Sequence, residues 1–224
     1  MTMWASDSEL FALMRERLFT AVVGDILDEL GLLHQFLPPN IRPLDENMIV
    51  AGRAMPALEA DLAEGRAPAK PFGLLMEALD DLKPDEVYIA SGSITPCYAM
   101  WGELMSTRAC VLGAAGAVLN GPSRDTRAIL DMKFPVFSTG RYAQDQKARG
   151  EVLDFRTAVD IEAVHVEPGD IVFGDIDGVV IVPRAVEREA LTRALEKVAK
   201  ENTVRTAILN GMSTADAFAK HGVM

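Results

Sequence analysis

Apolar residues near the N-terminus recur at helical spacing. The run Ser6–Glu9 has the Ser-x-x-Glu pattern of a capping box and precedes apolar residues within 10–14, so a first helix is predicted to begin here. Residues 21–30 place apolar side chains on one side and acidic side chains on the other, and Gly31 follows them. The start of the chain therefore predicts two amphipathic helices.

Helical and extended patterns then alternate along the chain. Strands are predicted over 48–55, 86–90, 117–120 and 135–138, and helices over 74–82, 104–112 and 126–132, whereas 59–70 is predicted to be a polar loop. A β-rich part follows, with strands expected over 160–166, 171–173 and 178–182. The order of these elements is typical of the α/β class.

The C-terminal segment has apolar residues at helical spacing from Val186 to Ile208, followed by Gly211 and a short helix after Ser213. A helix this long and only partly apolar often packs on a neighbouring subunit. We find no internal repeat and no linker, so residues 1–224 are predicted to form a single domain.

Composition narrows the classes of function. The chain is 49% hydrophobic and 25% charged, which is typical of a globular protein, and its net charge of −11 disfavours nucleic acid as a partner. The two cysteines have no CxxC spacing, and the N-terminus lacks a signal-peptide pattern. The longest apolar stretch, 109–119, is far short of the about 20 residues that a membrane span needs. We expect a soluble cytoplasmic protein that binds no membrane.

Several common kinds of site are missing from the sequence. His34, His165 and His221 are in no zinc-binding spacing. There is no Gly-x-Ser-x-Gly nucleophile elbow, no phosphate-binding loop with the Gly-Lys-Ser/Thr ending, and no glycine-rich cofactor loop that would favour a methyltransferase. The candidate chemistry therefore rests on carboxylates, arginines and backbone amides.

Two predicted strand-to-helix junctions concentrate such groups, and open α/β sheets bind ligands at such places. In Trp101-Gly102-Glu103-Leu104, the glycine lets the chain pass close to a ligand, and the following N–H groups begin a helix and suit a small carboxylate. In Gly121-Pro122-Ser123-Arg124-Asp125, the turn directs an arginine and an aspartate out of the strand end. Taken alone, the first run is more often an ordinary helix cap, and the second is more often a surface ion pair or a charged helix start.

The two runs, with Gly113–Gly116, Asn120 and Phe134–Phe137, resemble the RraA-like family, which includes 4-hydroxy-4-methyl-2-oxoglutarate aldolases and regulators of ribonuclease activity. Glu103, twenty intervening residues and Arg124-Asp125 match the family's acidic-x20-Arg-Asp signature. The resemblance implies a compact αββα sandwich related to the swivelling phosphohistidine domain, with a long C-terminal helix. It also implies homotrimers or homohexamers with active sites between subunits.

The resemblance further implies a class II pyruvate aldolase that cleaves 4-hydroxy-2-oxo acids to pyruvate and also decarboxylates oxaloacetate. Asp125 would bind Mg²⁺ or Mn²⁺ directly, and Glu103, with Glu201 of a neighbouring subunit, would hold coordinated waters. The amides of Gly102, Glu103, Leu104 and Met105 would bind the substrate's C1 carboxylate, and Arg124 its C2 oxygen. The alternative is a non-catalytic regulator that binds a ribonuclease or another protein, and Glu201 is then an ordinary exposed helix residue.

Two positions depart from the family's usual pattern: Glu103 stands where an aldolase often has Asp, and Pro122-Ser123 replaces a small apolar pair. The sequence does not identify the group beyond C4 of the substrate. Residues of the loops 56–72 and 140–156 would contact that group. Arg141 and Arg149 are candidates for binding a distal carboxylate, although arginines in such loops are more often ordinary surface residues. The sequence does not decide whether the protein forms a trimer or a hexamer, or whether it binds Mg²⁺ or Mn²⁺.

Overall fold

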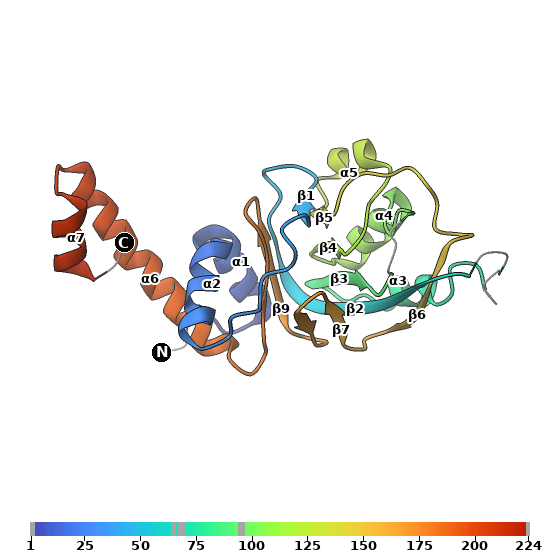
Figure 1. The fold of residues 1–224 in the computed structure, drawn as a ribbon, viewed down its shortest axis with the longest axis horizontal. Helices are drawn as coiled ribbons and strands as arrows, with labels where there is room; N and C mark the ends of the chain where they lie inside the picture. Colours follow the sequence, from blue (N-terminus) through green and yellow to red (C-terminus); the bar gives the residue numbers. More distant parts are fainter. Residues whose placement is uncertain (1–2, 64–65, 67–69, 94–96, 223–224) are drawn as a thin grey trace.

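A computed structural model describes residues 3–63, 66, 70–93 and 97–222. It has an eight-stranded sheet of order β1-β5-β4-β3-β2-β9-β10, to which β6 is added by pairing with β2, and a separate hairpin β7-β8 (Figure 1). The strands are β1 Arg42–Pro43, β2 Val50–Asp61, β3 Glu86–Ser91, β4 Gly116–Leu119, β5 Val136–Ser138, β6 Gly150–Phe155, β7 Val159–Ile161, β8 Val164–Val166, β9 Ile171–Asp175 and β10 Gly178–Val182.

The sheet branches at the long strand β2. One edge of β2 pairs with β3 in parallel, whereas the other edge pairs with β9 over its first residues and with β6 over its last, both antiparallel. A register shift between Leu58 and Glu59 lies within the β6 pairing. The prediction of a loop from residue 59 is therefore wrong for 59–61, because pairing with β6 extends the strand. Strand β6 itself was not predicted.

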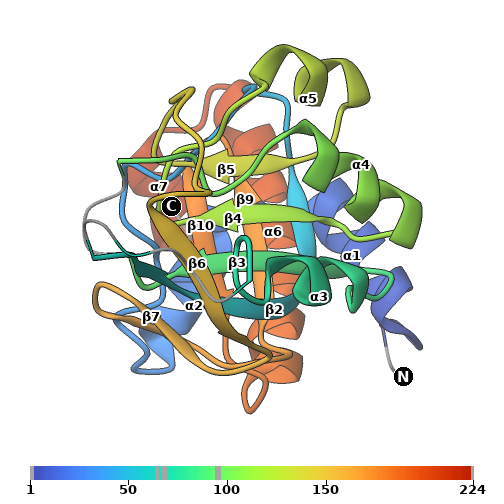
Figure 2. The same ribbon diagram turned by 90° about the vertical axis from the view of Figure 1, so that its right-hand side faces the viewer.

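The strands β2, β3, β4 and β5 are mutually parallel and form the part of the sheet that carries the candidate residues. Helices α3 (Leu75–Asp80), α4 (Glu103–Leu112) and α5 (Thr126–Met132) connect them. Figure 2 shows β5, β4 and β3 one above another, with α4 beside them. Since parallel strands end at the same edge of a sheet, the segments after β3, β4 and β5 meet at that edge.

A second helical layer covers the antiparallel strands. Helices α1 (Asp7–Arg17), α2 (Thr20–Glu29) and α6 (Glu187–Leu209) pack on the face of β9 that carries Ile171 and Phe173, whereas Val172 faces the other core. The predicted helix start is confirmed, because Glu9 N–H donates to Ser6 Oγ at 3.2 Å. The Glu9 carboxylate accepts from the N–H of Ala5 at 2.7 Å and not from that of Ser6, so the capping box forms only in part. The strands thus lie between two sets of helices, and the α/β class is confirmed.

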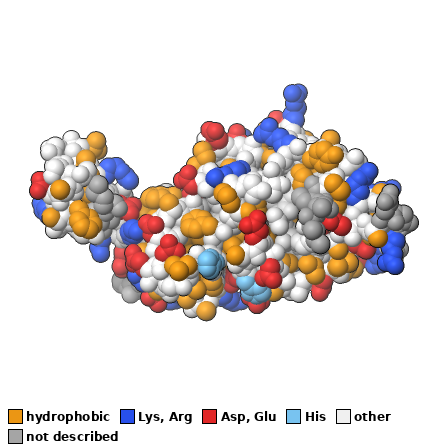
Figure 3. All heavy atoms as spheres, viewed as in Figure 1, with side chains coloured by type: hydrophobic (Ala, Val, Ile, Leu, Met, Phe, Trp, Pro, Cys, Tyr) orange, Lys and Arg blue, Asp and Glu red, His pale blue; other side chains and the backbone are white. Residues whose placement is uncertain are grey.

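The long C-terminal helix is also confirmed. Helix α6 runs away from the sheet and is followed by α7 (Thr214–His221), so the two project from the body of the molecule (Figures 1 and 3). Acidic and basic side chains are interspersed over the face in Figure 3. No helix in the described ranges is long and apolar enough to cross a bilayer.

Candidate active site at the carboxyl edge of the parallel strands

Backbone hydrogen bonds join the two junctions that the sequence singled out. Met100 N–H donates to the carbonyl of Pro122, and Arg124 N–H donates to the carbonyl of Trp101, each at 2.9 Å. The Trp101 ring is buried, and its Nε1–H donates to Ser106 Oγ at 2.7 Å, which anchors this segment to α4. The start of α4 and the start of α5 are therefore held side by side.

The carboxylate of Asp125 lies against the N-terminus of α4. Glu103 N–H donates to Asp125 Oδ2 at 3.2 Å, and Gly102 is the N-cap residue of α4. A Cβ atom at Gly102 would lie 2.8 Å from the same oxygen, so this close approach needs glycine. Asp125 itself has a left-handed backbone, with φ of 58°, at the N-cap of α5. The partial positive charge of the helix end attracts the carboxylate.

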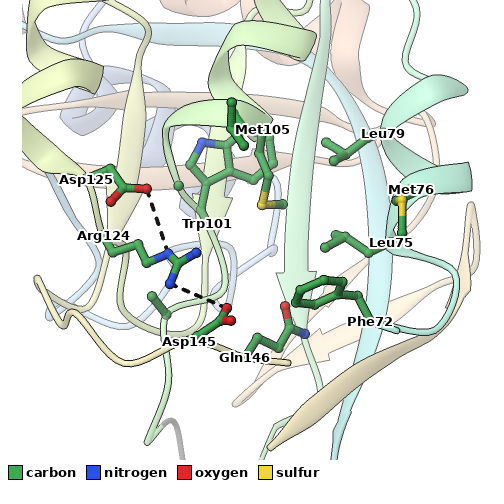
Figure 4. Close-up of a pocket in the computed structure, with 13 residues that line it drawn as sticks. Phe72, Leu75, Met76, Leu79, Trp101, Met105, Arg124, Asp125, Asp145 and Gln146 are labelled. Atoms are coloured by element: carbon green, nitrogen blue, oxygen red, sulfur yellow. Dashed lines mark ion pairs between the residues drawn. The ribbon is translucent and has the colours of Figure 1, made fainter. Parts of the chain in front are cut away.

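Arg124 lies between two carboxylates (Figure 4). Its Nε is 3.7 Å from Asp125 Oδ2, and its Nη1 is 3.4 Å from Asp145 Oδ1. The sequence singled out the loop 140–156 but not Asp145, because this residue belongs to no recognisable motif. The structure therefore adds Asp145 to the candidate site as the residue that orients Arg124.

These groups face a cavity of about 320 Å³ with two different sides (Figure 4). Arg124, Asp125 and Asp145 lie on the polar side, and residues of α3 lie opposite them. The cavity is lined by Phe72, Leu75, Met76, Leu79, Ala99, Trp101, Gly102, Leu104, Met105, Arg124, Asp125, Asp145 and Gln146.

Glu103 does not line this cavity, and its Oε1 accepts a hydrogen bond from Thr107 at 2.8 Å. Glu201 is on α6, which extends away from the end of the molecule that carries α4 (Figure 1). The structure thus brings together Gly102, Leu104, Met105, Arg124 and Asp125, with Glu103 adjacent. The role expected of Glu201 stays a prediction about a neighbouring subunit.

A buried carboxyl group supports the floor of the cavity. Gln146 Nε2 donates to Glu59 Oε2 at 2.7 Å, and both side chains are almost fully buried. Burial, reinforced by the charge of Asp61, raises the pKa of Glu59 to about 8, while the Gln146 hydrogen bond acts in the opposite direction. Glu59 is therefore largely protonated at neutral pH.

A hard cation fits the oxygen ligands that the cavity presents. Among the described residues, the hydrogen bond and the ion pair of the Asp125 carboxylate both use Oδ2, and Oδ1 takes part in neither. The described part of the chain holds no group of three or more His, Cys, Asp or Glu side chains arranged as a metal cluster. Mg²⁺ keeps several waters and needs few protein ligands, so the Asp125 carboxylate is the group of this cavity that could hold it.

Comparisons with known proteins identify the family of this chain. A family model described as RraA-like, Aldolase/RraA, matches residues 20–181. The chain is 30% identical over 199 residues to a Halalkalibacterium halodurans protein named "Putative 4-hydroxy-4-methyl-2-oxoglutarate aldolase", and the match covers 89% of each chain. The chain belongs to the RraA-like family.

Solved structures show the same fold. An uncharacterised protein from Pseudomonas syringae pv. tomato has a TM-score of 0.83 and 25% identity, over 97% of this chain and 95% of that one. Streptomyces coelicolor RraAS2, described as an unusual member of the RNase ES inhibitor RraA family, has a TM-score of 0.80 and 24% identity, over 91% of this chain and all of that one. The second likeness concerns the fold alone.

Proposed function

We propose that this protein is a divalent-metal-dependent class II pyruvate aldolase that cleaves 4-hydroxy-2-oxo acids and decarboxylates oxaloacetate. The observation that carries the proposal is that Arg124, Asp125 and the N-terminus of α4 face one cavity and contact one another. A cation, a carboxylate and free helix amides are the groups needed to hold a 2-oxo acid. The name of the Halalkalibacterium halodurans relative supports the same class.

In this proposal Asp125 binds Mg²⁺ or Mn²⁺ directly, and Glu103, together with Glu201 of a neighbouring subunit, holds coordinated waters. The ion supplies Lewis acidity toward the oxygens of the 2-oxo acid. The other roles belong to the chain itself. The N–H groups of the first turn of a helix have no acceptor within the helix. At the start of α4 the Glu103 N–H donates to Asp125 Oδ2, so the N–H groups of Leu104 and Met105, with that of Gly102, bind the C1 carboxylate.

Arg124 then donates to the substrate's C2 oxygen. When the C3–C4 bond breaks, a water molecule takes the proton of the C4 hydroxyl and C4 becomes a carbonyl, while the electron pair of the broken bond delocalises onto the C2 oxygen. The Arg124 guanidinium stabilises this enolate charge, and protonation at C3 gives pyruvate. Oxaloacetate passes through the same enolate when its C4 carboxylate leaves as CO₂, so one arrangement of residues serves both reactions.

The test is pyruvate release, measured with a coupled reductase, from oxaloacetate and from 4-hydroxy-4-methyl-2-oxoglutarate. We expect release with Mg²⁺ that excess chelator stops and that Asp125→Ala lacks. Release that persists in chelator would exclude the metal-dependent mechanism. No release from any 4-hydroxy-2-oxo acid or from oxaloacetate would instead favour the alternative, a regulator that binds a ribonuclease or another protein.

The proposed site is completed by assembly into a trimer or hexamer, because Glu201 cannot reach the cavity of its own chain. The exposed helix pair α6–α7 is available for such contacts (Figure 3). Glu201→Ala is therefore expected to lower activity in the intact assembly. Mixing Glu201→Ala subunits with Asp125→Ala subunits tests this arrangement. Hybrid assemblies would contain some complete sites and would regain activity. No recovery of activity would contradict a site shared between subunits.

A further inference from the structure

The side of the cavity opposite Arg124 and Asp125 is apolar. It is formed by the segment that leads into and forms α3, and it continues onto the first turn of α4, which lies beside Asp125 (Figure 4). We call it the apolar wall, and its residues are Phe72, Leu75, Met76, Leu79, Leu104 and Met105. Leu75 and Leu79 are largely buried, whereas Met76 and Leu104 are 55% and 78% exposed. The wall is thus anchored in the core and open toward a ligand.

Apart from Arg124, no described residue that lines the cavity carries a positive charge. Among the described lining residues Arg124 is the only cation, and it already contacts Asp125 and Asp145 on the other side. The two arginines considered from the sequence bond elsewhere: Arg141 donates to the carbonyl of Leu44, and Arg149 donates to that of Asp145. Neither of them lines the cavity.

We propose that the substrate carries an uncharged, apolar group on C4, such as an alkyl chain or an aromatic ring, and that this group packs on the apolar wall. The inference rests on the proposed function, because C1 and C2 must first be held at α4 and Arg124. The remainder of the molecule then extends from the polar side toward α3. The carbonyl product is accordingly an apolar aldehyde or ketone.

Two physical effects select such a group. Apolar atoms that leave water for the wall gain the hydrophobic free energy of burial. A carboxylate in the same place loses hydration and finds no cation to replace it. The name of the Halalkalibacterium halodurans relative specifies a substrate with a second carboxylate, so this chain is inferred to differ from that protein in what it accepts beyond C4.

The test compares two seven-carbon substrates that differ only at C7. In 4-hydroxy-2-oxoheptanoate the chain ends in a methyl group, and in 4-hydroxy-2-oxoheptanedioate it ends in a carboxylate. Retro-aldol cleavage gives pyruvate from both, together with butanal or succinic semialdehyde. We expect kcat/KM to be at least about tenfold higher for the methyl-ended substrate. Oxaloacetate decarboxylation serves as the reference for the proposed function.

A charge on the wall should reverse the preference. Met76→Arg places a cation at an exposed wall position, and we expect it to lower the ratio of the two kcat/KM values by about tenfold. Met3→Arg makes the same substitution at an exposed position outside the cavity and should leave the ratio as in the wild type.

The outcomes separate the two proposals. If oxaloacetate is decarboxylated but the dicarboxylate is cleaved as well as or better than the methyl-ended substrate, the apolar wall is not the specificity site and the proposed function stands. If Met76→Arg leaves the ratio unchanged but dissociates the oligomer in size-exclusion chromatography, the wall is covered by a second copy, which also overturns the inference. If none of the three substrates releases pyruvate, the proposed function fails and the inference fails with it.

Discussion

Gly102 and Asp125 approach each other so closely that a methyl group on Gly102 would lie 2.8 Å from Oδ2 of the carboxylate. The same oxygen accepts the N–H of Glu103 at 3.2 Å. The glycine therefore sets the position of the acidic side chain, and through Oδ2 also that of the neighbouring Arg124. A residue without chemistry of its own thus controls the geometry of two residues that have it.

Gly102→Ala is expected to lower kcat/KM for pyruvate release by about a hundredfold, because a displacement of about 1 Å at reacting groups has an effect of this size. Gly102 has an extended backbone that alanine adopts without strain, so the melting temperature should change little. Kinetics and a thermal unfolding curve measured on one preparation test both parts. Unchanged kinetics would show that the carboxylate has room to move.

Asp125→Asn should abolish turnover and weaken binding of the metal. Asparagine keeps the shape of the side chain, still accepts a hydrogen bond from Glu103 and tolerates the left-handed backbone, so the fold should persist. Mn²⁺ binding, followed by the loss of the free-ion signal in electron paramagnetic resonance, gives a readout independent of activity. Asp131→Asn, an exposed change on α5, is the matched control. Wild-type Mn²⁺ affinity in Asp125→Asn would exclude Asp125 as the ligand.

Arg124→Ala should lower kcat by about a hundredfold to a thousandfold, since it removes the donor that stabilises enolate charge. Asp145→Asn should lower kcat by about tenfold, because Asp145 acts only by orienting Arg124. The double variant tests this dependence. We expect Asp145→Asn to have no further effect in the Arg124→Ala background, whereas full additivity of the two losses would mean that Asp145 acts independently.

Glu59 should make stability depend on pH. Its pKa in the folded protein is raised from 4.5 to about 8, so the folded state retains a proton that the unfolded state loses in this range. The free energy of unfolding should therefore fall as pH rises from 4.5 to 8, with a limiting slope of about 1.4 kcal/mol per pH unit from this group.

Glu59→Gln should remove this contribution, because its amide oxygen can still accept from Gln146 and it does not ionise. Urea unfolding of both proteins at several pH values gives the difference, in which the pH dependence of His165, whose pKa is raised by Asp160 and Glu167, cancels. Parallel curves for the two proteins would show that Glu59 is already ionised below neutral pH.

The sequence by itself determined most of the elements and the two segments that carry the chemistry. Capping, as at Ser6, and helical periodicity are local properties, so they can be read without a structure. The family signature, Glu103 followed by Arg124-Asp125, is likewise a pattern of the sequence alone. The prediction that Arg124 and Asp125 lie together at the end of a strand agrees with their observed contact.

The tertiary structure decided those features that depend on contacts between residues distant in the sequence. Strand β2 continues to Asp61 only because β6 pairs with it, and no local pattern encodes that pairing. Asp145 contacts Arg124, and Gln146 contacts Glu59, because the loop that contains Asp145 and Gln146 folds back onto the edge of the parallel strands. The apolar wall joins α3 to the start of α4 in the same way. Contacts of this kind arise from packing, so the group beyond C4 could be inferred only from the folded cavity.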